Sequence, residues 1–202
     1  SVATEALDRL QPTAASHDRV MILEVMGRDA GHIALSAGIA GGADIILIPE
    51  ITYSLDRVVH KVAAVKAAGR NFALIVVSEA VKTPDGGAIQ VTHADGQKRY
   101  GGIGSYLCDQ IASLSGSDTR VTVLGHVQRG SAPSYNDRVL ASALGVKAVD
   151  LIAQGRCDRM VAWQNREVVD VPIEKAIAGY QAVDPDGTLV HTARGLGISF
   201  GD

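Results

Sequence analysis

Arg28 follows the end of a predicted buried strand, a position from which its positive charge could contact a ligand. It follows the apolar run Val20–Val25 after only Met26 and Gly27, and a small-residue segment, Asp29–Ala40, comes next. In open α/β sheets, ligands bind at the carboxyl ends of the strands, where helix N-termini point inward. A guanidinium offers a planar fork of donors that suits phosphate, and a neighbouring glycine allows close approach to the backbone. The pattern predicts a β-turn-α-β unit that carries a phosphate-binding arginine.

Other charged and polar side chains adjoin the remaining predicted strands. We expect them to gather around one edge of the sheet, where several cations favour an anionic ligand, most simply a phosphorylated one. A carboxylate among the cations suits hydroxyl groups, as on a sugar, because an ionised carboxylate only accepts hydrogen bonds. The candidate residues are Arg19, Arg28, Glu79, Arg120, His126 and Arg129.

Each candidate also has an ordinary interpretation. An arginine after a strand is commonly a solvated loop residue or an ion-pair partner, and Glu79 could cap the next segment or pair with an arginine. His126 could be a buried histidine with satisfied hydrogen bonds. These interpretations do not account for polar clusters at several strand ends, so the ligand-binding hypothesis is preferred.

A repeated strand-then-helix pattern would position these residues. Ser54 is a suitable N-cap for a helix over Leu55–Ala68, and Gly69 supplies its stop. Continuous apolar runs are typical of strands that are buried on both faces of a parallel sheet. The order of elements predicts an α/β fold with doubly wound parallel sheets. Strands are predicted over Val20–Val25, Ile45–Ile48, Phe72–Val77 and Arg120–Leu124, with a tightly turned pair over Met160–Trp163 and Val168–Val171.

The helices are predicted from apolar spacing and from proline and glycine. The first, Ala3–Leu10, is expected to end at Pro12, and a polar loop, Thr13–Arg19, should follow. Thr83–Gly104 is the longest irregular piece, either a surface excursion or a lid, and the tail from Asp184 shows no period. Further helices are predicted over Ile103–Leu114, Tyr135–Gln154 and Ile173–Tyr180.

The composition is that of an ordinary globular protein, with 202 residues, 47% hydrophobic and 20% charged. The net charge of -3 gives no reason to expect nucleic acid or an anionic membrane as a partner. No apolar run has membrane-spanning length, and the N-terminus does not resemble a secretory signal. Cys108 and Cys157 lie far apart without a His/Cys cluster, so neither a disulfide framework nor a metal site is predicted, and a cytoplasmic location is expected.

Two long motifs resemble the phosphofructokinase family, the ATP- or pyrophosphate-dependent 6-phosphofructokinases. The first is EVMGR at Glu24–Arg28, continued by AGHIALSAGIAGGAD, and the second is TRVTVLGHVQRG at Thr119–Gly130, continued by YNDRVLASALGVKAVDLI. SHDR at Ser16–Arg19 and Glu79 after its strand fit the same family. GGIGSYLCDQI at Gly101–Ile111 resembles a branch with an inserted loop, whose members use ATP or pyrophosphate.

The resemblance implies two doubly wound α/β domains with fructose 6-phosphate bound in the cleft. Met26 and Gly27 would hold the sugar through their backbone, and Arg28 would steady the phosphoryl group during transfer. The expected reaction moves a phosphoryl group from ATP or pyrophosphate, with Mg²⁺, to the 1-hydroxyl of fructose 6-phosphate.

The remaining candidates would bind the rest of the sugar phosphate. The resemblance implies that Glu79 accepts from sugar hydroxyls, while His126 and Arg129 bind the 6-phosphate and the sugar. Arg19 and Arg120 would reach the 6-phosphate across a subunit interface, so a homodimer or homotetramer is implied. The resemblance also implies an effector site, with Asp44 and Arg70 at the matching positions.

The sequence departs from the family pattern in two respects. Ser131 stands where the family usually has glycine, and a positive φ there would strain the loop. The glycine-rich donor loop of the family (GGDG type) and the segment with its general-base aspartate (TIDND type) do not occur in these residues. The chain is therefore expected to be a C-terminal portion that carries the sugar-phosphate half of the site and is inactive alone.

Family topology implies a division of the chain between two lobes. Residues 1–127 with 179–202 would form the fructose 6-phosphate-binding domain, and residues 128–178 would belong to the phosphoryl-donor domain and expose apolar surface. An alternative function is a non-catalytic module that binds or senses a sugar phosphate. A third reading, a kinase of another acceptor such as NAD or a lipid, is disfavoured by the two motifs.

Overall fold

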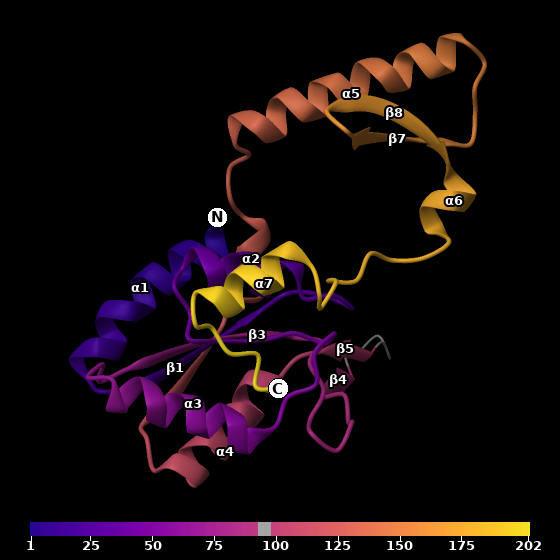
Figure 1. Ribbon diagram of the computed structural model, residues 1–202. Helices are drawn as coiled ribbons and strands as arrows, with labels where there is room; N and C mark the ends of the chain where they lie inside the picture. Colours follow the sequence, from indigo (N-terminus) through magenta and orange to yellow (C-terminus); the bar gives the residue numbers. More distant parts are fainter. Residues whose placement is uncertain (93–97) are drawn as a thin grey trace. The chain divides into compact units, whose positions relative to one another are not determined.

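A computed structural model of the chain describes residues 1–92 and 98–202 (Figure 1). These residues form two compact units, residues 1–131 with 182–202, and residues 132–181, which are described separately. The sequence analysis places the corresponding breaks after residues 127 and 178.

A four-stranded parallel sheet organises the larger unit. Its strands are β1 (Val20–Val25), β2 (Ile45–Leu47), β3 (Ala73–Ser78) and β6 (Thr119–Val123), in the order β2-β3-β1-β6. All three pairings are parallel, and β1 and β3 are buried along their whole length. The continuous apolar runs in the sequence therefore mark strands that are covered on both faces.

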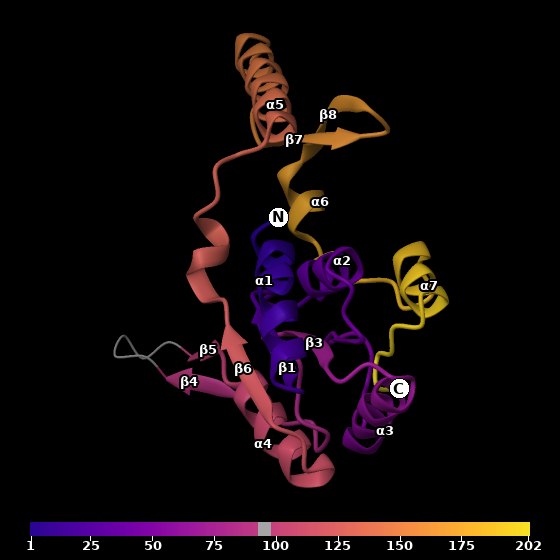
Figure 2. The ribbon, with the colours of Figure 1, turned by 90° about the vertical axis from the view of Figure 1, so that its left-hand side faces the viewer.

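Helices cover both faces of this sheet, as Figures 1 and 2 show. Because successive side chains of a strand point to opposite faces, Leu23 packs with α1 (Val2–Ser16), α2 (His32–Ala40) and α7 (Thr188–Gly195). Ile22, its neighbour in β1, packs with α3 (Leu55–Ala67) and α4 (Ile103–Ser115) on the other face. The predicted doubly wound α/β fold is confirmed.

The first helix is longer than the sequence suggests. The prediction that it ends at Pro12 is wrong, because α1 continues through Pro12 to Ser16 and replaces most of the expected polar loop. Ala14 is fully buried against Met21 and Leu74, so packing on the sheet outweighs the backbone hydrogen bond that proline cannot make.

Two other helix predictions have different outcomes. Ser54 is the N-cap of α3, where its side chain accepts a hydrogen bond from the Arg57 amide at 3.3 Å, as predicted. The tail from Asp184 is not irregular throughout, because α7 lies within it and buries Val190 and Ala193.

The segment Thr83–Gly104 is not wholly irregular. It contains β4 (Gln90–Thr92) and β5 (Lys98–Tyr100), which pair antiparallel. Part of the predicted excursion or lid, residues 93–97, lies outside the described residues.

The smaller unit joins a long helix to a hairpin. α5 (Tyr135–Ala153) begins at a capping box formed by Ser134 and Asp137. β7 (Arg159–Gln164) and β8 (Glu167–Pro172) pair antiparallel, and α6 (Ile173–Ile177) follows, three residues shorter than predicted. Asn165 and Arg166 both have positive φ, 50° and 68°, which is the type I′ geometry of a tight hairpin.

The smaller unit also exposes apolar side chains. Those in α5 include Val139, Val146, Val149 and Ile152. In the described part of the chain, no helix combines the length and apolar character that crossing a membrane requires.

Candidate functional site

The turn after β1 is held by side chains from two other strand ends. The amide of Met26 donates to Gln128 Oε1 at 3.2 Å, and the amide of Gly27 donates to Glu79 Oε1 at 3.1 Å. Glu79 directly follows β3, and Gln128 lies in η1 (Gly125–Arg129), the short 3₁₀ helix after β6. The carboxyl ends of three neighbouring strands thus meet at this turn.

Residue 27 must be glycine in this turn, because there is no room for a side chain. A Cβ at this position would lie 2.7 Å from the carbonyl oxygen of Ala30 and 2.7 Å from Ser78 Oγ. The Ser78 hydroxyl donates to the carbonyl oxygen of Gly27 at 3.2 Å, which fixes the peptide from its other side. The backbone just before Arg28 is therefore tightly fixed.

Three basic or titratable side chains at this edge of the sheet are open to a ligand. Arg28, His126 and Arg129 are all exposed, and none forms a hydrogen bond or ion pair with any residue that the structure describes. The alternative of a buried, satisfied His126 is therefore wrong. A fixed backbone beside two exposed guanidinium groups can receive an anion without breaking contacts among the described residues.

Glu50 holds the far end of the Arg28 turn, a role the sequence analysis missed. Both of its carboxylate oxygens accept from the Gly31 amide, at 3.0 and 3.1 Å, and Oε1 accepts from the Val183 amide at 2.8 Å. Its position shortly after the second strand, at the carboxyl edge, was the available signal. Gln128 was also missed, although it lies within the second motif between His126 and Arg129.

Glu24, within the first motif, is a buried carboxylate with a structural partner. It accepts from the Gly104 amide at 2.7 Å and the Gly102 amide at 3.3 Å, at the start of α4. The N-terminal end of a helix stabilises negative charge, which makes burial of this group tolerable. Glu24 therefore joins β1 to the start of α4.

Arg19 and Arg120 do not lie at the same edge as Arg28, which corrects the expected single cluster. Arg19 precedes β1 and Arg120 lies near the start of β6, so both lie at the amino edge of a parallel sheet. Five residue steps along β1 separate the two edges by roughly 16 Å. The structure therefore has two basic clusters, one at each edge.

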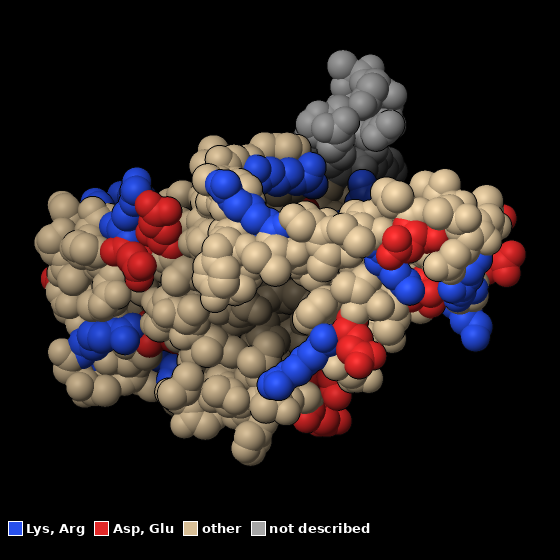
Figure 3. All heavy atoms as spheres, turned by 90° about the horizontal axis from the view of Figure 1, so that it is seen from above, with Lys and Arg blue, Asp and Glu red and all other residues tan. Residues whose placement is uncertain are grey.

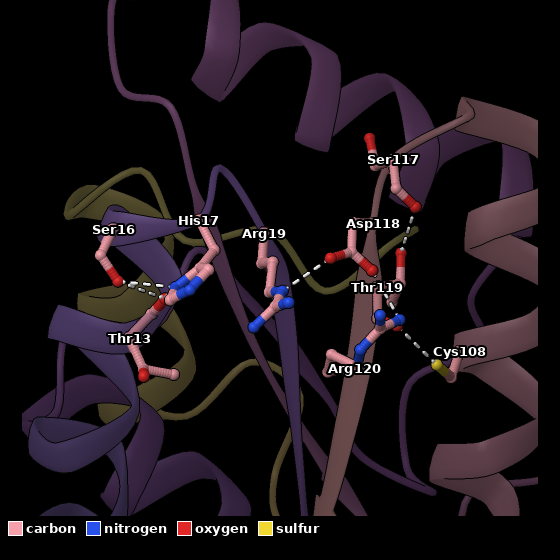
Figure 4. A network of polar contacts seen from close by, with 9 residues as sticks. All are labelled: Thr13, Ser16, His17, Arg19, Cys108, Ser117, Asp118, Thr119 and Arg120. Carbon is pink, nitrogen blue, oxygen red and sulfur yellow. Dashed lines mark hydrogen bonds and ion pairs between the residues drawn. The ribbon is translucent and has the colours of Figure 1, made fainter.

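Asp118 brings Arg19 and Arg120 together at the amino edge (Figure 4). Its Oδ2 accepts from Arg19 Nε at 2.6 Å, and its Oδ1 lies 2.5 Å from Arg120 NH1. The hydrogen bond from Arg19 and the positive charges of Arg120, Arg19 and His17 outweigh desolvation and hold the pKa of this carboxyl below its usual range. Asp118 stands two residues before Arg120, but the sequence analysis did not single it out.

Asp44 and Arg70 contact each other. Arg70 donates to Asp44 Oδ2, which also accepts from the Leu74 amide at 2.8 Å. The guanidinium of Arg70 lies 4.5 Å from the centre of the Phe72 ring. In this structure the two residues form an ion pair at the start of β2 and β3.

Three further observations concern the backbone at Ser131, metal-binding groups and the distribution of charge. Ser131 does not have positive φ, so the loop carries none of the backbone strain that a positive φ at this serine would cause. Among residues 1–92 and 98–202, no group of three or more His, Cys, Asp or Glu side chains could hold a metal ion. On the face shown in Figure 3, basic and acidic side chains are interspersed among uncharged residues.

Comparisons with known proteins identify the family. A family model described as phosphofructokinase matches residues 1–152. The chain is 63% identical over 202 residues to the ATP-dependent 6-phosphofructokinase 1 of Nostoc sp. The match covers 100% of this chain and 56% of that protein. It is 51% identical over 201 residues to the ATP-dependent 6-phosphofructokinase of Chloroflexus aggregans, covering 100% of this chain and 55% of that protein.

Solved structures give the same result for the fold. Phosphofructokinase from Saccharomyces cerevisiae matches with a TM-score of 0.71 at 27% identity, over 96% of this chain and 24% of that chain. Pyrophosphate-dependent phosphofructokinase from Nitrosospira multiformis matches with a TM-score of 0.75 at 22% identity, over 100% of this chain and 54% of that chain.

The chain spans about half the length of the curated relatives it matches. The family model covers 152 of its 202 residues, and both sequence motifs lie within that match. The chain therefore belongs to the phosphofructokinase family.

Proposed function

We propose that the natural protein containing this chain transfers a phosphoryl group from ATP to the 1-hydroxyl of fructose 6-phosphate. This chain supplies the sugar-phosphate half of the site. The observation that carries the proposal is the Arg28 turn, whose backbone is held by Gln128 and Glu79 while the Arg28 side chain stays exposed without a partner among the described residues.

Arg28 is assigned to the phosphoryl group in transfer. Charge spreads over the oxygens of that group in the transition state, and a guanidinium held in place stabilises it without reorganising. Glu79 uses Oε1 to hold Gly27, and its carboxylate accepts from sugar hydroxyls; His126 and Arg129 bind the sugar and its phosphate. Residues 1–127 with 179–202 would be the sugar-phosphate domain, and residues 128–178 part of the donor domain.

The proton of the attacking 1-hydroxyl needs an acceptor. We assign none of the described carboxylates to that task, because none stands in a segment that resembles the general-base motif of the family. Glu79, Glu50 and Glu24 already accept hydrogen bonds from backbone amides. The described residues also do not form a metal site, so they do not fit a protein cage for Mg²⁺. In the proposed reaction Mg²⁺ is held chiefly by the donor phosphates.

The active form is proposed to be a cytoplasmic homodimer or homotetramer. Arg19 and Arg120 lie at the opposite edge of the sheet from Arg28, too far to bind the same sugar phosphate within one copy. They would contact the 6-phosphate of a sugar bound by a second copy. An effector site at Asp44 and Arg70 would require an incoming anion to compete with their ion pair.

ATP is proposed as the donor because similar relatives are named ATP-dependent. The test is formation of fructose 1,6-bisphosphate by the natural protein, with ATP or pyrophosphate supplied in turn. ATP-dependent product supports the proposal, and product with pyrophosphate alone would correct the donor.

The second candidate function, a non-catalytic sugar-phosphate module, is favoured by the lack of recognisable donor-loop and general-base motifs in these residues. Saturable binding of fructose 6-phosphate without turnover on either donor would support that alternative and overturn the proposed reaction.

A further inference from the structure

The register of the sheet places an acid between two arginines at its amino edge. Val20 pairs with Thr119, so the residues just before them, Arg19 and Asp118, lie side by side, and the Val20 amide donates to the Asp118 carbonyl oxygen at 3.0 Å. Side chains two apart in a strand share a face, so Asp118 and Arg120 point the same way. Thr119, between them, is 3% exposed.

Asp118 uses only part of each guanidinium. It contacts Arg19 through Nε and Arg120 through NH1, which also donates to the Thr119 carbonyl oxygen at 3.0 Å (Figure 4). In the described part of the chain, neither the terminal nitrogens of Arg19 nor Nε and NH2 of Arg120 donate a hydrogen bond. Each arginine therefore keeps donors for another anion while it is held by the acid.

Charge explains why an acid is useful in this position. Two guanidinium groups held close together repel each other, and a carboxylate between them offsets that repulsion. The cluster keeps a net positive charge, and the side chains of Arg19, Asp118 and Arg120 are 26%, 39% and 57% exposed. The arginine pair is thus both oriented and accessible to a phosphate dianion.

We propose that Asp118 is a positioning residue, which holds Arg19 and Arg120 at the spacing and orientation that bind the 6-phosphate of a sugar in a second copy of the chain. This inference rests on the proposed function. It differs from the alternative in which Asp118 occupies the arginines in place of phosphate and must be displaced.

The test compares Asp118→Asn, Asp118→Ala and Asp118→Glu in the natural protein, with Asp109→Asn as the matched control. Asp109 is an exposed carboxylate on α4. The first two variants are expected to raise KM for fructose 6-phosphate about tenfold, the effect of losing one charge-assisted hydrogen bond, with kcat within about twofold. Asp118→Glu should recover most of the loss, and the control should match the wild type.

A fall in KM would overturn the proposal, because Asp118 would then be a competing anion. An unchanged KM, or a fall in kcat alone, would also overturn it. Loss of folded protein, checked by circular dichroism, would remove the alanine variant from the comparison and leave the asparagine and glutamate variants to decide.

Binding of inorganic phosphate separates this inference from the proposed function. Calorimetric titration of phosphate into the wild type, Asp118→Asn and Asp109→Asn needs no turnover. If the wild type fails to phosphorylate fructose 6-phosphate, the proposed reaction fails, while weaker phosphate binding by Asp118→Asn alone still supports the positioning role. Equal phosphate binding in all three proteins, or none in the wild type, would contradict it.

Discussion

Gly27 shows how one residue type fixes the geometry of the candidate site. Any side chain here would meet the Ala30 carbonyl oxygen and Ser78 Oγ, so the peptide before Arg28 can approach β3 closely only if residue 27 is glycine. The backbone conformation that places Arg28 therefore depends on the absence of a Cβ at residue 27.

Gly27→Ala is expected to destabilise the larger unit by about 1–3 kcal/mol, the usual cost of overpacking. Denaturant unfolding of the natural protein measures the change. Gly195→Ala is the matched control, because a Cβ there meets nothing within 4 Å. Equal stability of the two variants would show that the Arg28 turn has room to adapt.

The candidate residues were predictable from the sequence one by one, but their partners were not. Continuous apolar runs in the sequence predict the strands, and four candidates follow the ends of these runs: Arg28, Glu79, His126 and Arg129. Gln128, Glu50 and Asp118 act through hydrogen bonds to residues between 19 and 133 positions away, and single-sequence spacing does not encode such pairings. Grouping Arg19 and Arg120 with Arg28 failed because strand ends were combined without regard to strand direction.

At the scale of elements, the loop between β1 and α2 is held at both ends. Gln128 and Glu79 hold its first residues, and Glu50 holds Gly31 together with Val183 in the returning chain. A Cβ at Gly31 would lie 2.2 Å from Ile48, so this end of the loop is also packed without space.

Glu50→Ala should cost about 2–3 kcal/mol of unfolding free energy, because two backbone amides lose a charged acceptor. Glu50→Gln, which keeps one acceptor oxygen, should cost less. Glu5→Gln is the control, since among the described residues the Glu5 side chain makes polar contact only with Arg9, in an exposed ion pair that is worth about 0.5 kcal/mol or less. A loss at Glu50 no larger than at Glu5 would contradict the assigned role.

The first helix tests how far tertiary packing overrides local preference. Strand runs, helix α5 and the Ser54 cap followed from local patterns, whereas α1 beyond Pro12 and the short α7 depend on burial of Ala14, Val190 and Ala193 in the assembled core. Such contacts exist only after the chain has folded, so local rules end α1 early and miss α7.

Pro12→Ala should stabilise the larger unit by about 1–3 kcal/mol, because alanine restores an amide that can donate within the helix and removes the clash with the preceding turn. Thermal unfolding of the two proteins gives the sign. Destabilisation by this change would mean that the chain does not continue as a helix through residue 12.

At the scale of the whole molecule, the two units are stabilised differently. The larger unit has apolar cores on both faces of its sheet, whereas the smaller unit relies partly on charges around Asp170. Desolvation works against ionisation of Asp170. The hydrogen bond from Arg159 and the charges of Arg156, Arg159 and Lys147 outweigh it and hold the pKa of this carboxyl below its usual range.

The smaller unit should therefore be acid-sensitive. A carboxyl whose pKa is depressed on folding contributes stability above its unfolded pKa, about 3.9, and loses it as the pH falls through the folded value. Fluorescence of Trp163, the single tryptophan, reports unfolding of this unit. Asp170→Asn should flatten the pH dependence below about pH 4, while the exposed-site control Asp150→Asn should leave it unchanged. Equal profiles for both variants would exclude Asp170 as a source of the sensitivity.

The central claim is that the sheet presents Arg28 to a phosphoryl group moving onto fructose 6-phosphate. The most direct measurement is the steady-state rate of fructose 1,6-bisphosphate formation by the natural protein and its Arg28→Ala variant. We expect kcat to fall by about two to three orders of magnitude while KM for fructose 6-phosphate changes by less than about threefold, the pattern of a group that acts in the transition state. An unchanged kcat with a raised KM would contradict the account and make Arg28 a substrate-binding residue only.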